Sequence, residues 1–394
     1  EIKIASKRLV QNMITAGIVC EYNPFHNGHR YHIEKTRESA NACICVMSGN
    51  FTQRGRPAIA DKFTRARCAV SGGADLGLEL PAVFAVRSAE TFARGAIGLL
   101  DALGCVDLLS FGCECGSLSA LEKAAELLSR EGSEFQALLK TGLSDGLSFP
   151  AARERAVRHI LGDADTLTQP NDILAVEYLK WLKRYHSSIR PMAVQRSFIG
   201  YHSTEPEGKY ASASYLRSHP EELERYTDVA DVLRDCPHFP VSPANLDTVI
   251  LATLRKMTVE QIAGICDCTE GLENRIKQAV NEAGTLDELI ELVKTKRYTH
   301  TRIERLLTCS LLGIQKTEYP LDYIRVLAMN QTGRALLREI KKRCRLPVIT
   351  NLSKQQIDSP SLTIDLLAGD LYSLLYDSGR QAGMDYTTSP YVEE

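Results

Sequence analysis

Short apolar runs alternate with amphipathic stretches through the first third of the chain. Each run has the length of a strand and stops where small or polar residues begin. Strands that recur about every 30 residues, with a helix between them, predict right-handed βαβ units and a parallel sheet. The expected strands are Thr15–Tyr22, Ala42–Met47, Leu76–Leu80 and Val106–Phe111, and the expected helices are Asn27–Ser39, Lys62–Ser71, Arg87–Leu103 and Leu118–Ser129.

The pattern changes along the rest of the chain. Residues 133–187 are helical in pattern, and residues 190–196 predict another strand that rejoins the sheet. Beyond Pro240, helices are joined by short polar turns, with one brief apolar run at Leu346–Ile349. We therefore expect an α/β fold in which a Rossmann-like parallel-sheet domain over residues 13–238 precedes a mostly α-helical domain over residues 239–394, with residues 1–12 an added, non-native segment.

The turn after the first strand carries the most informative residues. The chain turns at Asn23-Pro24, and a helix begins at or near His26-Asn27-Gly28-His29. Two imidazoles three residues apart share one helix face, and Gly28 lets a ligand approach the backbone closely. Amides at a helix N-terminus attract phosphate, and two histidine donors suit the charge on an α-phosphorus under attack. Ordinary surface histidines and a zinc site are the alternatives, although no third ligand stands close in sequence.

A second phosphate clamp is expected at Tyr210–Arg217. Hydroxyl residues at a helix N-terminus bind phosphate oxygens through side chain and amide together, which suits Ser212. Arg217 falls one turn into that helix and reaches the β- or γ-phosphate with paired donors. The alternative is a serine N-cap beside a surface arginine. Ligands of parallel sheets bind beyond the carboxyl ends of the strands, where His26–His29, the loop Ser48–Pro57 and Phe111-Gly112 all lie.

Composition narrows the class of protein. The 394 residues are 44% apolar and 24% charged, with a net charge of −2, which is ordinary for a globular chain. No apolar run approaches the roughly 18 residues that span a membrane. Twelve cysteines without any C-x-x-C spacing are expected to be reduced core residues of a cytoplasmic protein. We expect no membrane association and no metal held by protein ligands alone.

The runs EYNPFHNGH, VMSGNFTQRGRPA, FARG, PNDIL, ASASYLR and KTKRYTHTR occur in this order. Together they resemble the tRNA(Met) cytidine acetate ligase family, part of the nucleotidyltransferase superfamily with a His-x-Gly-His motif. The likeness covers Met13 to about Asn351. It implies an ATP-dependent ligase that converts acetate to acetyladenylate and acetylates N4 of the wobble cytidine, position 34, of elongator tRNA(Met), giving N4-acetylcytidine. The family's serine-alanine-threonine run appears here as Ser212-Ala213-Ser214, which keeps the hydroxyl group.

The resemblance also implies which residues form the site. Gly112 would allow close backbone approach, Asn171 would bind an adenine or ribose edge, and Arg196 would pair with phosphate or carboxylate. A turn glycine, a helix N-cap and a surface arginine are the respective alternatives. We expect Mg²⁺ to bridge the phosphates, although the sequence shows no dedicated carboxylate cage. The expected catalytic residues are His26, His29, Ser212 and Arg217, and the ATP site would add Val19, Cys20, Glu21, Tyr22, Asn23, Pro24, Phe25, Asn27, Gly28, Gly112, Asn171, Arg196, Ser197 and Ser214.

Positive charge gathers late in the chain. Between Lys294 and Arg345, thirteen Lys and Arg stand against four acidic residues, an excess of nine in a chain whose net charge is −2. Such a segment on a mildly acidic protein indicates polyanion binding, and interleaved rings fit an RNA backbone with stackable bases. A solvated helix face is the alternative for single residues. The expected tRNA-binding residues are Lys294, Lys296, Arg297, Tyr298, Arg302 and Arg305.

Two other functions remain open from the sequence. An adenylyl- or cytidylyltransferase for a small molecule would use a nucleotide without RNA, and it leaves the basic segment unexplained. A non-catalytic RNA-binding protein with a degenerate nucleotide fold predicts a broken phosphate motif, whereas both halves of that motif are intact here.

Overall fold

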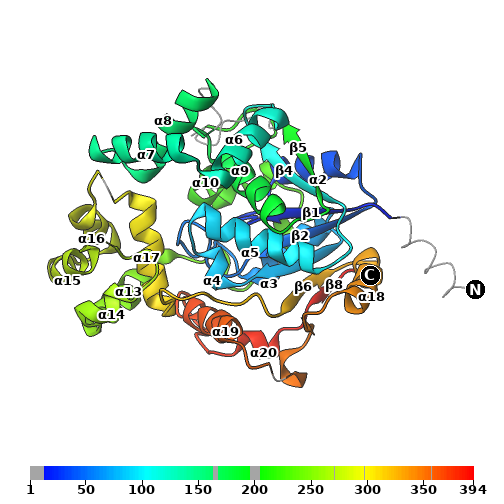
Figure 1. Cartoon of the computed structure of the whole chain (residues 1–394). Helices are drawn as coiled ribbons and strands as arrows, with labels where there is room; N and C mark the ends of the chain where they lie inside the picture. Colours follow the sequence, from blue (N-terminus) through cyan, green and yellow to red (C-terminus); the bar gives the residue numbers. More distant parts are fainter. Residues whose placement is uncertain (1–12, 163–166, 196–204, 270, 297, 356) are drawn as a thin grey trace, which may run out of the picture.

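A mixed sheet organises the molecule (Figure 1). The computed structural model describes residues 13–162, 167–195, 205–269, 271–296, 298–355 and 357–394, so residues 1–12, Arg196, Ser197 and Arg297 lie outside the described residues. Seven strands follow the order β5-β4-β1-β2-β3-β6-β7, and β8 pairs with β6. The strands are β1 (Thr15–Cys20), β2 (Ala42–Ser48), β3 (Leu76–Leu80), β4 (Leu108–Cys113), β5 (Arg190–Gln195), β6 (Ile324–Met329), β7 (Val348–Ile349) and β8 (Tyr391–Val392).

The first five strands are parallel. β1 lies between β2 and β4, with Ile18 opposite Cys45 on one side and Ser110 on the other. The order β3-β2-β1-β4-β5 matches the Rossmann-like arrangement, and the winding direction reverses between β1 and β4. Both faces of this sheet are covered, which explains why its strands are continuous apolar runs rather than alternating ones. The expected α/β class is confirmed.

The helices that connect these strands lie close to their expected positions. The helix expected at 87–103 begins instead at Ala89, because Ser88 caps it by accepting the Thr91 amide. A separate short helix forms directly after Pro81. The helices of this half are α2 (Asn27–Arg37), α3 (Lys62–Ser71), α4 (Ala82–Ala85), α5 (Ala89–Ala102), α6 (Leu118–Arg130), α7 (Ser133–Ser144), α8 (Phe149–Leu161), α9 (Pro170–Arg184), α10 (Ala213–Ser218), α11 (Leu223–Tyr226) and α12 (Ala230–Arg234), with the 3₁₀ turn η1 (Pro220–Glu222).

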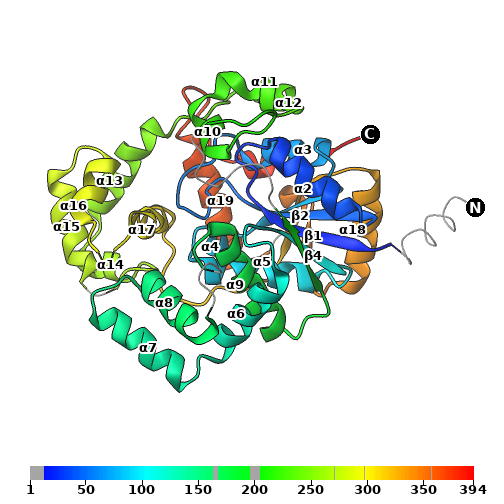
Figure 2. The same ribbon diagram turned by 90° about the horizontal axis from the view of Figure 1, so that it is seen from above.

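A block of helices then lies to one side of the sheet. In both views it is on the side away from the start of β1 and from the C-terminus (Figures 1 and 2). Its apolar residues recur at helical spacing, and they pack α15 on α16 and α13 on α17. We call it the helical block. It contains η2 (Pro243–Asn245), α13 (Leu246–Lys256), α14 (Val259–Ala263), α15 (Leu272–Glu282), α16 (Leu286–Val293) and α17 (His300–Leu312).

The chain then returns to the sheet, which corrects the expected domain boundary. β6 pairs antiparallel with β3, with Gly77 opposite Ala328, so residues after 320 extend the sheet that residues 13–238 begin. A helical domain from residue 239 to the end therefore does not describe this chain, because only the helical block stands apart. The returning elements are β6, α18 (Gln331–Arg343), β7, η3 (Leu352–Lys354), α19 (Pro360–Ser373), α20 (Met384–Thr387) and β8.

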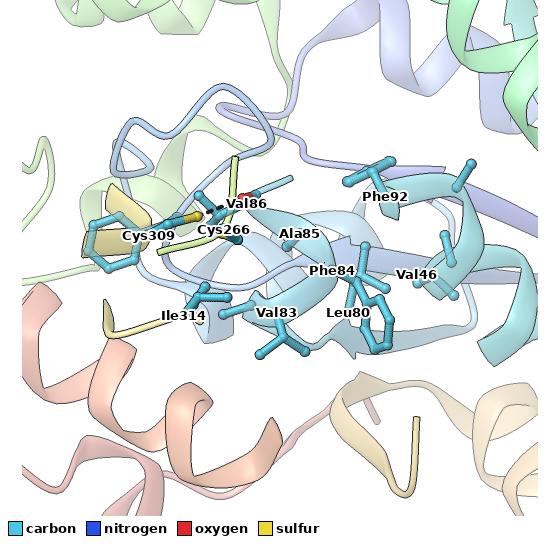
Figure 3. Close-up of a cluster of buried hydrophobic side chains, with 14 of the residues drawn as sticks. Val46, Leu80, Val83, Phe84, Ala85, Val86, Phe92, Cys266, Cys309 and Ile314 are labelled. Atoms are coloured by element: carbon cyan, nitrogen blue, oxygen red, sulfur yellow. Dashed lines mark hydrogen bonds between the residues drawn. The ribbon is translucent and has the colours of Figure 1, made fainter. Parts of the chain in front are cut away.

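The main hydrophobic core runs from the sheet into the helical block. Figure 3 shows Val46 and Leu80 of the strands beside Phe84 of α4, with Cys309 of α17 and Ile314 at the far end of the same cluster. The Cys309 thiol lies 3.3 Å from the Val86 carbonyl oxygen and donates to it. All twelve cysteines are free thiols. Within the described part of the chain, no helix combines the length and apolar character needed to cross a bilayer.

Candidate active site

A cavity of about 480 Å³ opens at the carboxyl ends of β1 and β4, where the winding of the sheet reverses. Its volume falls within the roughly 300–1,000 Å³ typical of small-molecule sites. The structure brings most of the expected residues to it, although their positions in sequence span nearly 200 residues. The expected residues that line it are Val19, Cys20, Glu21, Tyr22, Asn23, His26, Gly28, His29, Gly112, Asn171, Ser212, Ser214 and Arg217.

His26 and His29 form the N-terminus of α2 together. His26 is the N-cap, and its Nδ1 accepts the Gly28 amide at 3.0 Å. Nδ1 of His29 accepts the His26 amide at 3.3 Å, so the two side chains form a reciprocal capping box. A neutral ring whose Nδ1 accepts carries its proton on Nε2. In this tautomer each ring is a hydrogen-bond donor at Nε2.

Two neighbouring residues hold this pair of rings. The Tyr22 ring centroid lies 4.7 Å from that of His29, and the Tyr22 hydroxyl lies 3.6 Å from the Cys45 sulfur. Burial raises the pKa of Tyr22 well above its usual value, so its phenol stays neutral. A Cβ at Gly28 would stand 2.9 Å from Cε1 of His26, so only glycine leaves the ring in place.

Three residues expected at the ATP site do not line the cavity. Phe25 is fully buried beneath α2 and α3, where its ring fills the space beside Gly72. Asn27 donates from Nδ2 to the Lys209 carbonyl oxygen at 2.8 Å. Pro24 shapes the turn. The motif therefore contains both lining and supporting residues, which the sequence alone did not separate.

Ser212 and Arg217, the second pair of expected phosphate ligands, lie beside the turn. Ser212 is the N-cap of α10, since its hydroxyl oxygen accepts the Tyr215 amide at 3.1 Å, and it also lines the cavity. Arg217 donates from Nη1 to the Asn23 carbonyl oxygen at 2.8 Å and from Nη2 to Ser214 Oγ at 2.9 Å. The arginine is thus fixed against the His26 turn. Both the capping role and the position at the cavity hold for Ser212.

The other wall comes from β4 and α9. Gly112 lies within β4, opposite Val194 of β5, so it is not a turn glycine. Asn171 follows Pro170 in the first turn of α9 and is not its N-cap, and its amide donates to the Glu114 carboxylate. Asp172 beside it accepts the amides of Glu114 and Cys115, each at 2.9 Å. These bonds fix the loop after β4.

Cys113, Cys115 and Asp172 lie close together beside this wall. Their ligand-type atoms are within 4.8 Å of one another, the one such trio found among the described residues. From the sequence these cysteines were expected only to be core residues. The two sulfur atoms are 3.4 Å apart, and both Asp172 oxygens accept backbone amides. These contacts account for the trio as a part of the loop's structure.

The loop Ser48–Pro57 also lines the cavity. None of its side chains was among the site residues expected from the sequence. Buried Arg65 holds its base, donating to the carbonyl oxygens of Ser48, Gly49, Ala60 and Glu21. Glu21 Oε1 accepts the Gln53 amide at 2.6 Å. The one sequence feature that could have indicated these lining residues is the position of the loop directly after a predicted strand. The lining residues that were missed include Tyr31, His32, Thr52, Gln53, Arg54, Arg56, Gln195 and Thr301.

Comparison with known proteins identifies the family. The sequence profile described as HIGH Nucleotidyl Transferase matches residues 13–386. The tRNA(Met) cytidine acetate ligase of a Thermoanaerobacter species is 41% identical over 392 residues, which cover 94% of this chain and 97% of that protein. The chain belongs to the tRNA(Met) cytidine acetate ligase family. The ligase of Acetivibrio thermocellus is 38% identical, covering 95% of this chain and 99% of its own.

Solved structures of the family agree. Apo TmcAL of Thermotoga maritima matches with a TM-score of 0.90 at 33% identity, covering 96% of this chain and 99% of that chain. The same protein bound with alpha-thio ATP matches with a TM-score of 0.86 at 32% identity and the same coverage. Family membership confirms both the resemblance and the assignment of the chain to the ligases.

The basic residues between Lys294 and Arg345, which the sequence suggested as one RNA-binding segment, lie in separate parts of the structure. Lys294 and Lys296 are exposed just before α17. Arg325 is only 3% exposed and pairs with Asp385 at 2.9 Å in the core, and the basic residues of α18 lie across the sheet from the helical block (Figures 1 and 2). The excess of positive charge is therefore not one surface.

Two expected tRNA-binding residues are also placed differently. Tyr298 is 8% exposed and belongs to the main core, which corrects its expected role as a stacking surface. Arg305 is largely buried, and its Nε lies 3.7 Å from Asp267. Arg302 lies over the Tyr298 ring and donates to Thr269. A sequence in which aromatic and basic residues alternate does not show whether the aromatic rings face water or the core.

Proposed function

We propose that this chain is an ATP-dependent acetate ligase that forms acetyladenylate and acetylates N4 of the wobble cytidine of elongator tRNA(Met). The observation that carries the proposal is that both expected phosphate clamps line one cavity: His26 and His29 at the start of α2, and Ser212 and Arg217 at α10. The names of the relatives and the ATP analogue bound in TmcAL support the substrates. Similarity over 94% of the chain, helical block included, favours this function over a nucleotidyltransferase for small molecules.

The first step joins acetate to the nucleotide. An acetate oxygen attacks the α-phosphorus, the bond from that phosphorus to the bridging β-phosphate oxygen breaks, and pyrophosphate leaves. The Nε2–H groups of His26 and His29 donate to the phosphoryl oxygens, where negative charge grows in the transition state. Arg217, fixed against Asn23, neutralises the leaving phosphates. Gly112 and Asn171 stand where the adenosine would lie.

The second step transfers the acetyl group. The exocyclic amine of cytidine attacks the acetyl carbonyl, the bond to the phosphate oxygen breaks, AMP leaves, and the amine loses a proton. The protein acts mainly by holding both reactants in one cavity. Mg²⁺ fits this site only in part, because Glu21 is the one carboxylate among the described lining residues and it is already bonded to Gln53. Phosphate oxygens and water would supply most ligands, and the ion would neutralise phosphate charge.

Isotope tracing tests the function directly. Elongator tRNA(Met) is incubated with labelled acetate and ATP, or with labelled acetyl-coenzyme A without ATP, and the nucleosides are analysed by mass spectrometry. We expect label in N4-acetylcytidine only from acetate and ATP, and acetate-dependent ATP–pyrophosphate exchange without tRNA. Label that arrives only from acetyl-coenzyme A would overturn the proposal.

A further inference from the structure

The helical block reaches the cavity at one place. Thr52, Gln53, Arg54 and Arg56 of the loop after β2 line the cavity, and so does Thr301 in the first turn of α17. Among the described lining residues, Thr301 is the only one that follows Arg217 in the chain. We call residues 52–56 and 300–304 together the loop–helix rim.

The two parts of the rim touch through their backbones. Gly55 has a φ of +87°, and a Cβ there would lie 2.7 Å from the Glu304 carbonyl carbon and 2.8 Å from the Arg305 amide nitrogen. The Thr308 hydroxyl donates to the Gly55 carbonyl oxygen. Only glycine allows this approach. The loop is therefore seated on the side of α17.

A charged pair completes the contact. Arg56 Nε donates to Glu304 Oε1, and His300 Nδ1 lies 3.3 Å from Glu304 Oε2. Burial alone would lower the pKa of Arg56, but the nearby Glu304 and Asp287 carboxylates outweigh it and raise that pKa. Arg56 is thus a fixed cation at the cavity, and the Glu304 side chain, 10% exposed, holds it.

The helix that carries the rim is firmly anchored. Residues Leu306 to Leu312 of α17 are all buried, and Cys309 bonds to Val86 in the shared core (Figure 3). Exposed Lys294 and Lys296 precede α17 by only a few residues. Two exposed cations of the helical block therefore lie close to the rim in the sequence.

We infer that the loop–helix rim is where the target nucleotide of the tRNA enters the cavity; the inference rests on the proposed function. Gly112 and Asn171 form the adenosine wall, and Ser212 and Arg217 form the triphosphate wall. Among the other described lining residues, the rim alone contributes arginines, Arg54 and Arg56. Arg54 and Arg56 suit the phosphates that flank an unstacked nucleotide, and the polar Thr301 faces its base. Glu304 is a positioning residue, which acts by holding Arg56.

Photocrosslinking tests the inference. Thr301 is replaced by p-benzoylphenylalanine, the protein is irradiated with elongator tRNA(Met), and the crosslinked nucleotide is mapped by primer extension. We expect crosslinks at nucleotide 34 or its neighbours. The control carries the same residue at exposed Lys341 of α18, which lies across the sheet from the helical block (Figures 1 and 2), and should not crosslink to the anticodon loop. Crosslinks from position 301 to the acceptor arm or elbow, or no crosslinks at all despite intact tRNA binding, would overturn the inference.

A kinetic test does not depend on the bulky probe. Glu304→Gln should raise KM for tRNA in acetyl transfer by roughly tenfold or more, because Arg56 loses its fixed position. Glu304→Asp should recover part of the loss. Equal losses in acetyl transfer and in exchange without tRNA would place Glu304 in the general structure and overturn its positioning role. Failure of the proposed function is distinguishable, since the parent protein would then fail in exchange as well.

Discussion

The imidazole rings of His26 and His29 are stacked with their centroids 3.7 Å apart, and each Nδ1 accepts an amide hydrogen of the same helical turn. The backbone thus fixes the tautomer of both rings. Two histidines in sequence become two oriented donors only because they cap the helix that they begin. The two candidate site residues are therefore also the residues that cap α2.

Removing either donor should slow the first chemical step. We expect His26→Asn and His29→Ala to slow acetate-dependent ATP–pyrophosphate exchange by roughly 10²–10³-fold, the usual cost of losing one transition-state donor. Asparagine at position 26 still caps a helix, so the melting temperature should change little there. His159→Ala, on the exposed face of α8, is the matched control. Exchange within threefold of the parent in both variants would contradict the assignment.

Adding one methyl group at Gly28 should lower activity without lowering the stability of the fold. The Cβ of Gly28→Ala would press on the His26 ring, whereas alanine itself favours a helix by about 0.5–1 kcal/mol. We therefore expect roughly 10²-fold slower exchange from a displaced ring without a lower melting temperature. Gly132→Ala is the control, since its Cβ would meet nothing within 4 Å. An active Gly28→Ala protein would show that the ring position is not critical.

The sequence predicted local structure well and long-range contacts poorly. The strand Leu76–Leu80 and the helix Lys62–Ser71 have the expected bounds, because each depends on local periodicity and caps. The six residues Ile324–Met329, apolar except for Arg325, are equally consistent with a buried helix, so their antiparallel pairing with β3 had no local signature.

In the candidate site, too, the sequence predicted residues with local geometry and missed contacts between distant residues. His26 and His29 are found from a motif, since three positions along one helix determine their geometry. The contact between Gly55 and Thr308 joins residues 253 positions apart, and no spacing predicts it. Tyr298 illustrates the remaining ambiguity, because an aromatic ring among cations is compatible with either a core or an RNA surface.

Salt dependence should reveal the tRNA-binding face. Lys294→Ala combined with Lys296→Ala removes two exposed cations beside α17, so the log–log salt slope of tRNA binding should flatten by roughly 1–2. Exchange without tRNA should stay unchanged. Lys123→Ala with Lys140→Ala, two exposed positions on α6 and α7, should keep the parental slope. An unchanged slope in the first pair would assign tRNA binding to another surface.

The core that joins the returning C-terminal elements to the sheet should make stability depend on pH. Asp365 of α19 accepts the Ala82 amide at 2.7 Å and the Tyr323 hydroxyl, and it is 1% exposed. Burial, with the nearby Glu79 charge, raises its pKa from 3.8 to about 8. The folded chain therefore binds one more proton than the unfolded chain between these pH values, and its free energy of unfolding falls as the pH rises through them.

Asp365→Asn should remove this contribution. The amide keeps an acceptor for Ala82 and does not ionise, so the variant's stability should decline less between about pH 4 and pH 8 than the parent's, by up to about 1.4 kcal/mol per pH unit. Urea unfolding at several pH values measures the difference, and Asp358→Asn, at an exposed position, is the control. Parallel curves for the parent and Asp365→Asn would show that the buried carboxyl is already ionised, held by the cation of Lys62 rather than by a proton.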